Sequence, residues 1–108
     1  MDRELLKGYI DLIILGIVKS ETTYGYKIIK QIYELSENNL EIKEATLYLS
    51  LKRLEKKKYV ISSWGKENYY PRRKYYEITD EGKKYLNNKY DEIIKINTLI
   101  KKIMEGSV

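Results

Sequence analysis

Basic side chains are the residues of this sequence best placed to do chemistry, and they gather in its central third. Residues 43–74 contain ten Lys and Arg against three Asp and Glu, whereas residues 1–42 contain five against seven and residues 75–108 contain six of each. The net charge of +5 therefore comes from one segment. A cluster of this kind neutralises phosphates, which favours a nucleic-acid partner. The alternative is a lysine-rich solvated surface.

Most other chemistry lacks its usual residues. The sequence has no histidine and no cysteine, which removes the common zinc ligands, thiol nucleophiles, Ser-His-Asp triads and disulfides. It has no glycine-rich phosphate loop, and its adjacent acidic residues would not face each other on a helix. We expect neither an enzyme nor a metal or cofactor site. The longest apolar run, residues 12–18, is too short to span a bilayer, and the N-terminus does not resemble a signal peptide, so we expect a cytoplasmic protein.

A helix expected at residues 43–57 opens the basic segment. Its apolar side chains recur at helical spacing and should face the core: Leu47, Tyr48, Leu51 and Leu54. The other side carries a polar row suited to reach base edges and phosphates from the major groove: Thr46, Ser50, Arg53 and Lys57. The alternative is the solvated face of an ordinary surface helix.

A hairpin with a long tip should follow this helix. Two β-rich runs, residues 59–64 and 73–78, flank a loop that contains the only proline, Pro71. Residues 66–74 combine basic side chains with tyrosines and have no evident packing role. A rigid arm that contacts phosphates or the minor groove would explain them. The alternative is a solvated hairpin loop.

Two helices should precede the basic segment. The first is expected at residues 3–19, where the apolar positions are too dense for a single stripe and predict cover on two sides. The second should start with Thr22 or Thr23 as its N-cap and run to about Leu35. These two helices would support the helix at residues 43–57.

The last helix is expected at residues 80–104, with Thr79 as its N-cap. One apolar row follows an alternating four-three spacing: Leu86, Tyr90, Ile93, Asn97, Ile100 and Met104. A second row contains Ile96, Leu99 and Ile103. One small domain can cover only one row, so we expect the other to meet a second copy of the chain, with Asn97 fixing the register. The alternative is a helix that folds back on its own domain.

This order of elements indicates a mainly α fold with a small β-hairpin: a winged helix-turn-helix at residues 1–79, then a dimerisation helix at residues 80–108. Five segments, in the same order and at compatible spacing, resemble the PadR family of transcriptional regulators: LLKGYID at 5–11, YGYKI at 24–28, ATLY at 45–48, LKRLE at 51–55 and PRRKYYEITDEG at 71–82. The resemblance covers nearly the whole chain. It implies a bacterial or archaeal DNA-binding repressor of the short kind, with a single C-terminal helix.

The resemblance also implies partners and sites. The expected partners are a pseudo-palindromic operator in double-stranded DNA, a second copy of the chain, and a small aromatic or drug-like effector that releases the DNA. The residues expected to contact DNA are Lys43, Thr46, Tyr48, Ser50, Arg53, Lys57, Arg72, Arg73 and Lys74. Those expected at the effector and dimer interface are Tyr9, Tyr90, Ile93, Ile96, Asn97 and Ile100, which could alternatively be plain interface core.

Four positions depart from the family pattern. Relatives usually have Ser or Thr where Lys43 stands, Pro at Leu49, Gly at Lys58 and Gly at Tyr70. Lysine at a helix start loses a side-chain cap but could bind a phosphate. A second function stays open, in which the winged helix is a protein-interaction module whose basic wing binds an acidic partner.

Overall fold

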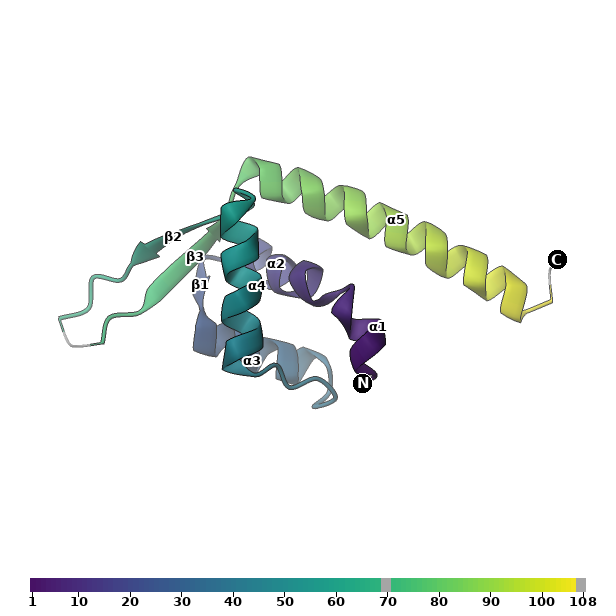
Figure 1. The fold of residues 1–108 in the computed structure, drawn as a ribbon, viewed down its shortest axis with the longest axis horizontal. Helices are drawn as coiled ribbons and strands as arrows, with labels where there is room; N and C mark the ends of the chain where they lie inside the picture. Colours follow the sequence, from purple (N-terminus) through teal and green to yellow (C-terminus); the bar gives the residue numbers. More distant parts are fainter. Residues whose placement is uncertain (69–70, 107–108) are drawn as a thin grey trace.

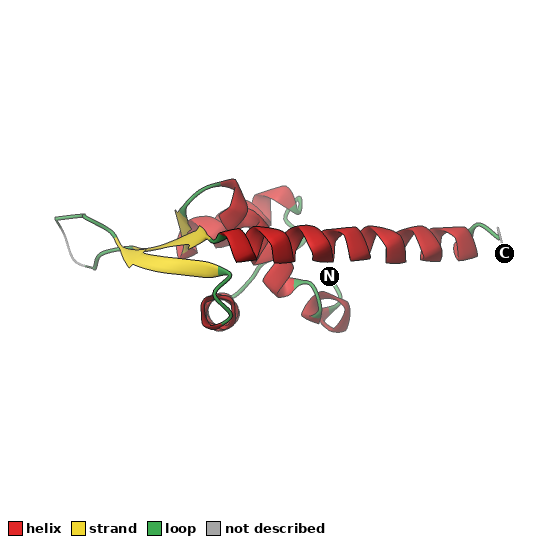
Figure 2. Ribbon diagram, turned by 90° about the horizontal axis from the view of Figure 1, so that it is seen from above, coloured by secondary structure: helices red, strands yellow, loops and turns green. Residues whose placement is uncertain are grey.

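The computed structural model describes residues 1–68 and 71–106, so Tyr69 and Tyr70 of the expected arm lie outside the described residues. Five helices and three strands follow one another along the described chain: α1 (Arg3–Lys7), α2 (Ile10–Ser20), β1 (Thr23–Tyr24), α3 (Gly25–Leu35), α4 (Glu44–Lys56), β2 (Val60–Trp64), β3 (Lys74–Ile78) and α5 (Asp80–Met104). Helices α2, α3 and α4 pack together with the sheet. The β2–β3 hairpin and α5 project from this body in opposite directions (Figures 1 and 2). The fold is the mainly helical winged arrangement that the sequence predicts.

The core lies between α2, α3, α4 and the sheet. Its fully buried side chains come from each of these elements: Ile14, Leu15, Val18, Ile28, Leu47, Leu51, Leu54 and Val60. Leu40 and Ile42, in the segment between α3 and α4, are also buried. Because this segment is pinned at two points, the start of α4 is held against the body.

The expected single helix at residues 3–19 is wrong. The chain forms α1 and α2 instead, with a break at Gly8 and Tyr9. Asp2 caps the first helix by accepting a hydrogen bond from the Leu5 amide at 3.1 Å. Gly8 then ends it, since glycine is a poor helix former and a good helix terminator. The break lets α1 turn away from α2.

The expected N-cap at Thr22 or Thr23 is also wrong. Thr23 and Tyr24 form the short strand β1, and Tyr24 is the N-cap residue of α3. Strand β1 pairs antiparallel with β3, Thr23 opposite Tyr76, so the sheet has three strands in the order β1-β3-β2 rather than two. Thr23 and Tyr24 suit a strand because β-branched and aromatic side chains pack well on a pleated surface.

Helix α5 is joined firmly to the body at its start. The Thr79 hydroxyl accepts a hydrogen bond from the Gly82 amide at 3.0 Å and donates one to the Lys58 carbonyl at 2.7 Å. Gly82 lies so close to the Tyr59 carbonyl oxygen that a Cβ would collide with it. The rings of Tyr59 and Tyr85 stack with centroids 4.3 Å apart. The first turns of α5 therefore have a fixed direction relative to the winged body.

Candidate nucleic-acid interface

The outer face of α4 presents a mixed basic and apolar surface. Its exposed residues define what we term the α4 row: Ala45, Leu49, Lys52 and Lys56. Tyr48 lies beside this row and is 48% exposed. Lysines can bind phosphates, while alanine and leucine side chains can contact thymine methyl groups in the major groove. The α4 row is therefore chemically suited to duplex DNA.

The expected polar row on α4 is wrong at Ser50. This residue is fully buried, and its hydroxyl donates to Asp11 Oδ1 of α2 at 2.5 Å, so it cannot reach a base. Thr46 and Lys57 are exposed on the same flank of α4 as Ser50. The error came from Tyr48, which was counted as core. An aromatic ring with a polar tip can stay at the surface, and placing it inside rotated the predicted buried face.

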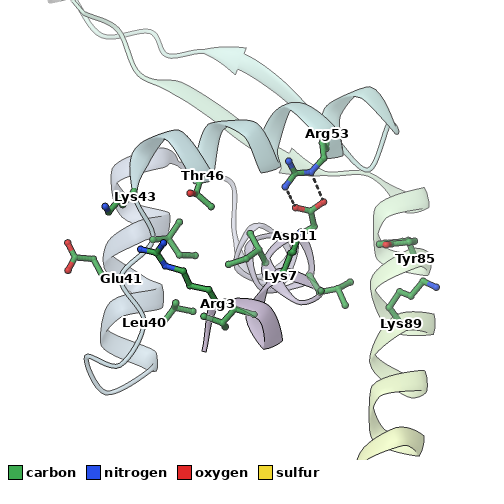
Figure 3. A pocket seen from close by; sticks show the side chains of 15 residues that line it. Arg3, Lys7, Asp11, Leu40, Glu41, Lys43, Thr46, Arg53, Tyr85 and Lys89 are labelled. Atoms are coloured by element: carbon green, nitrogen blue, oxygen red, sulfur yellow. Dashed lines mark hydrogen bonds and ion pairs between the residues drawn. The ribbon is translucent and has the colours of Figure 1, made fainter. Parts of the chain in front are cut away.

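Arg53 is exposed in part but is not free. Its Nε donates to Asp11 Oδ2 at 3.2 Å and its Nη2 donates to Asp11 Oδ1 at 2.8 Å (Figure 3). Burial raises the pKa of Asp11, but hydrogen bonds from Arg53 and Ser50 and the charges of Arg53 and Lys57 outweigh this effect and hold the pKa below its ordinary value of 3.8. Asp11 is thus ionised at neutral pH and engages Arg53 on the α2 side of the helix.

Lys52 and Lys56 are interface candidates that sequence reasoning missed. A signal for them exists, because Leu47, Leu51 and Leu54 alone define the buried face. Positions on the opposite side of a 3.6-residue helix include 45, 49, 52 and 56. If Tyr48 is left out of the predicted core, the exposed face of the helix lies opposite the three leucines and contains both lysines.

Both ends of α4 carry lysines. Lys43 has an extended conformation at the N-cap, and in the described chain its side chain makes no capping hydrogen bond. At the other end Lys58 has φ of 65°. The Tyr59 amide bonds to the Leu54 carbonyl and the Lys58 amide to the Glu55 carbonyl, both at 2.9 Å, which is the helix-ending pattern that favours glycine at position 58. Both lysines are exposed.

Tyr48 is held against the start of α3. A Cβ built on Gly25 would collide with the Tyr48 hydroxyl and would lie 3.3 Å from a methyl group of Leu47. Glycine at this position therefore lets α4 approach the N-terminus of α3 closely. Tyr48 therefore lies at the start of α3, and the first turn of a helix is where backbone amides lack intrahelical partners and a phosphate could bind.

Side chains at the root of the wing fix it to the sheet. Arg73 lies over the Tyr24 ring of β1, 4.4 Å from its centroid, and Lys74 lies 5.7 Å from the Trp64 centroid. The Tyr75 hydroxyl donates to Glu67 at 3.2 Å across the hairpin. Arg72 is exposed beyond this root. The wing thus carries its basic side chains on an ordered base.

An open groove of about 920 Å³ lies between α1, the start of α2, the residue 40–43 segment, α4 and α5. Its charged lining residues, most of them basic, are Arg3, Lys7, Asp11, Glu41, Lys43, Arg53 and Lys89 (Figure 3). In the described chain this lining does not include Tyr9, Tyr90 or Ile93, which were expected to enclose an effector. Their role stays a prediction.

The described residues contain no group of three or more acidic side chains arranged to hold a metal ion. Within the same residues, no helix has the length and apolar character needed to cross a membrane.

The order of α2, α3, α4, wing and α5 defines a winged helix-turn-helix protein. Residues 14–88 match the family described as "Transcriptional regulator PadR-like family", and the chain belongs to it. PadR regulators bind DNA, and a family of transcriptional regulators confirms the expectation that the chain is not an enzyme.

Similar proteins match almost the whole chain. A transcriptional regulator from Clostridium thermocellum is 39% identical, with 94% of this chain and 96% of that chain covered and a TM-score of 0.86. A PadR family transcription regulator from Clostridium difficile is 38% identical, with coverages of 89% and 98% and a TM-score of 0.77. An uncharacterised Lysinibacillus sphaericus protein is 38% identical over 103 residues, which are 95% of this chain and 94% of that protein.

Proposed function

We propose that the protein is a homodimeric repressor that binds a pseudo-palindromic operator with α4 and the wing of each copy. In this proposal residues 1–79 contact DNA and residues 80–108 hold the two copies together. Loss of operator binding would follow from a small aromatic or drug-like effector bound between the copies.

The observation that carries the dimer is one continuous row along α5. The α5 row alternates steps of four and three residues: Gly82, Leu86, Lys89, Ile93, Ile96, Ile100 and Ile103. Its first residues pack on the body, since Gly82 is buried and Leu86 is half-buried. Ile96, Ile100 and Ile103 are 51–53% exposed. This spacing is that of helices that pair along a shared stripe, so a second α5 suits the exposed half.

Tyr90, Asn97 and Met104, which the sequence placed on the main row, are exposed on the α5 surface. They lie next to the α5 row rather than on it. Asn97 could still set the register from the edge of a paired interface. The effector proposal keeps Tyr9, Tyr90 and Ile93 as its candidate lining.

DNA binding is supported by the α4 row and by the wing. The two surfaces belong to one body because β3 pairs with both β1 and β2, and β1 leads directly into α3. Two such bodies, joined by α5, would present two recognition helices to DNA. A two-fold protein of this kind reads two half-sites related by the same symmetry.

Fluorescence anisotropy with duplex DNA from upstream of the protein's own gene, against a shuffled duplex of the same length, tests the proposal. We expect preference for the upstream duplex, a steep loss of affinity with salt, and a dimer in sedimentation. Equal weak binding to both duplexes that vanishes at physiological salt would instead favour a protein-interaction module. The effector is tested by screening phenolic acids and planar cationic dyes for release of DNA, with Tyr90→Ala as the comparison. A reporter under the bound promoter distinguishes repression from activation.

A further inference from the structure

Asp11, Ser50 and Arg53 form a compact cluster between α2 and α4, which we term the Asp11 cluster. Figure 3 shows its Asp11–Arg53 pair. Both carboxylate oxygens of Asp11 are engaged. Oδ1 accepts from Ser50 Oγ at 2.5 Å and from Arg53 Nη2 at 2.8 Å, and Oδ2 accepts from Arg53 Nε at 3.2 Å. The Asp11 side chain is 27% exposed, so the cluster is partly shielded from solvent.

The geometry of the Asp11 cluster constrains how α4 is oriented. Ser50 and Arg53 are three residues apart and therefore lie about one turn apart along one flank of the helix. The forked Arg53 contact also fixes the angle between guanidinium and carboxylate, which a single hydrogen bond would not. A helix held at two points on one flank resists rotation about its own axis.

The rotation of α4 about its own axis determines which of its side chains would contact DNA. The α4 row lies on the outer face, and Ser50 is buried on the flank that faces α2. Turning the helix would carry Lys52 and Lys56 away from the direction in which the body presents them. Such a small displacement is enough to lose contacts that need hydrogen-bond geometry.

We propose that Asp11 is a positioning residue for DNA binding, which acts through Ser50 and Arg53 to set the rotation of α4 that presents Lys52 and Lys56. Arg53 acts through Asp11 and not by contact with a base or a phosphate. The inference rests on the proposed operator binding and adds to it a determinant that lies on a different helix from the DNA-contacting surface.

The direction in which Asp11→Asn changes operator affinity makes the proposal testable. Asp11 is an anion close to the proposed DNA-binding face of α4. Long-range electrostatics alone therefore predicts that Asp11→Asn tightens DNA binding. Positioning predicts the opposite for the operator. Binding to random DNA depends mainly on net positive charge and should change little.

The experiment measures operator and random-duplex affinity, salt slope and thermal melting for the wild type, Asp11→Asn, Arg53→Met, Arg53→Lys and the double variant Asp11→Asn/Arg53→Met. Glu41→Gln is the matched control, because Glu41 is an exposed acidic residue that lines the same groove. We expect Asp11→Asn to lower operator affinity about tenfold in folded protein. Glu41→Gln should leave it equal or slightly higher.

The Arg53 variants separate positioning from direct contact. On the random duplex, Arg53→Met should leave the salt slope unchanged, whereas loss of a phosphate contact made by Arg53 itself would lower its magnitude by about 0.9. Arg53→Lys keeps the charge but loses the fork, so its operator affinity should fall nearly as far as that of Arg53→Met. The double variant should bind no more weakly than either single variant, because both remove the same contact. If Asp11→Asn does not fold, the two Arg53 variants decide the question.

Asp11→Asn that binds the operator as tightly as the wild type, or more tightly, would overturn the positioning role. So would a lower salt slope on the random duplex in Arg53→Met, or full operator affinity in Arg53→Lys. A wild-type protein without operator preference would overturn the proposed function, and this inference with it. The two failures are therefore distinguishable.

Discussion

Helices α4 and α5 are both largely exposed on one side, but their chemistry differs. The exposed side of α4 carries lysines among small and apolar residues, and both of its ends carry lysines where a capping side chain or a glycine would suit the backbone. Helix α5 has a side-chain cap at Thr79 and half-exposed isoleucines along its outer half. Helix α4 carries positive charge at its ends, where other residues would make the helix more stable. Helix α5 keeps a well-formed start and exposes apolar surface.

This difference indicates that the two helices bind different partners. It also predicts that different solution conditions should restore the binding lost in variants of each helix. A polyanion is bound through charge, so a defect in α4 should be relieved by lowering the salt concentration. A second copy is bound through apolar burial, so a defect in α5 should be relieved by raising the protein concentration. Substitutions on the two helices and on the wing test this contrast.

Ile100→Asp on α5 should have the largest effect. It would bury a charge in the proposed dimer interface, so we expect a monomer in sedimentation and a loss of operator affinity on the order of hundredfold, because two half-sites would no longer be bound together. Thr98→Asp is the control, since position 98 lies on the opposite side of the same helix. A monomeric wild type, or equal effects of the two substitutions, would remove the assembly role from α5.

Lys52→Ala and Lys56→Ala on α4 should each weaken DNA binding about tenfold near 0.1 M salt and lower the magnitude of the salt slope by about 0.9. Sedimentation should show the same oligomer as the wild type. Arg72→Ala on the wing should lower the slope equally but affect operator and random duplex alike. Unchanged slopes for the α4 variants would show that this face does not contact phosphates.

Lys43→Ser should change stability and affinity in opposite directions. A serine N-cap can bond a free amide in the first turn of α4 and should raise the free energy of unfolding by about 1 kcal/mol. Losing the charge should weaken DNA binding by a smaller factor than Lys52→Ala does. Denaturant melts and anisotropy check the two effects. In the Lys43→Ala control, affinity should fall equally without the gain in stability.

Lys58→Gly should have the smallest effect, and its main consequence should be a gain in stability. Residue 58 has φ of 65°, a backbone region that glycine adopts without the Cβ conflict of other residues. We expect the free energy of unfolding to rise by up to about 1 kcal/mol, measured by urea denaturation. Lys58→Ala removes the same charge but keeps a Cβ, so a similar gain in that variant would refute the backbone explanation.

Much of the fold could be predicted because local signals agree with it. The extent of α4, the two strands of the hairpin and the Thr79 cap of α5 all follow from spacing, turn residues and capping chemistry. The break at Gly8 and the strand at Thr23 and Tyr24 could not be found in this way. A glycine in an apolar helical pattern is an ambiguous signal, and β1 exists only because β3 comes from the far half of the chain to pair with it.

The site was predicted less well, for a reason visible at two residues. Ser50 is polar and was placed outside, but an acidic partner on α2 satisfies its hydroxyl inside the protein. Tyr48 is aromatic and was placed inside, but it is 48% exposed and its hydroxyl end meets Gly25 at the start of α3. Both errors depend on neighbours distant in sequence, which periodicity along one helix does not contain.

The pairing of β1 with β3 also has a kinetic consequence. It pairs Thr23 with Tyr76 and Tyr24 with Tyr75, residues that are separated in the sequence by most of the winged body. Contacts of such long sequence separation form late and slow the folding of small domains. We therefore expect the helices to assemble first and the wing to reach its final orientation in the last step. A newly synthesised or refolding chain would therefore reach its full affinity for DNA only after the wing has taken its final orientation.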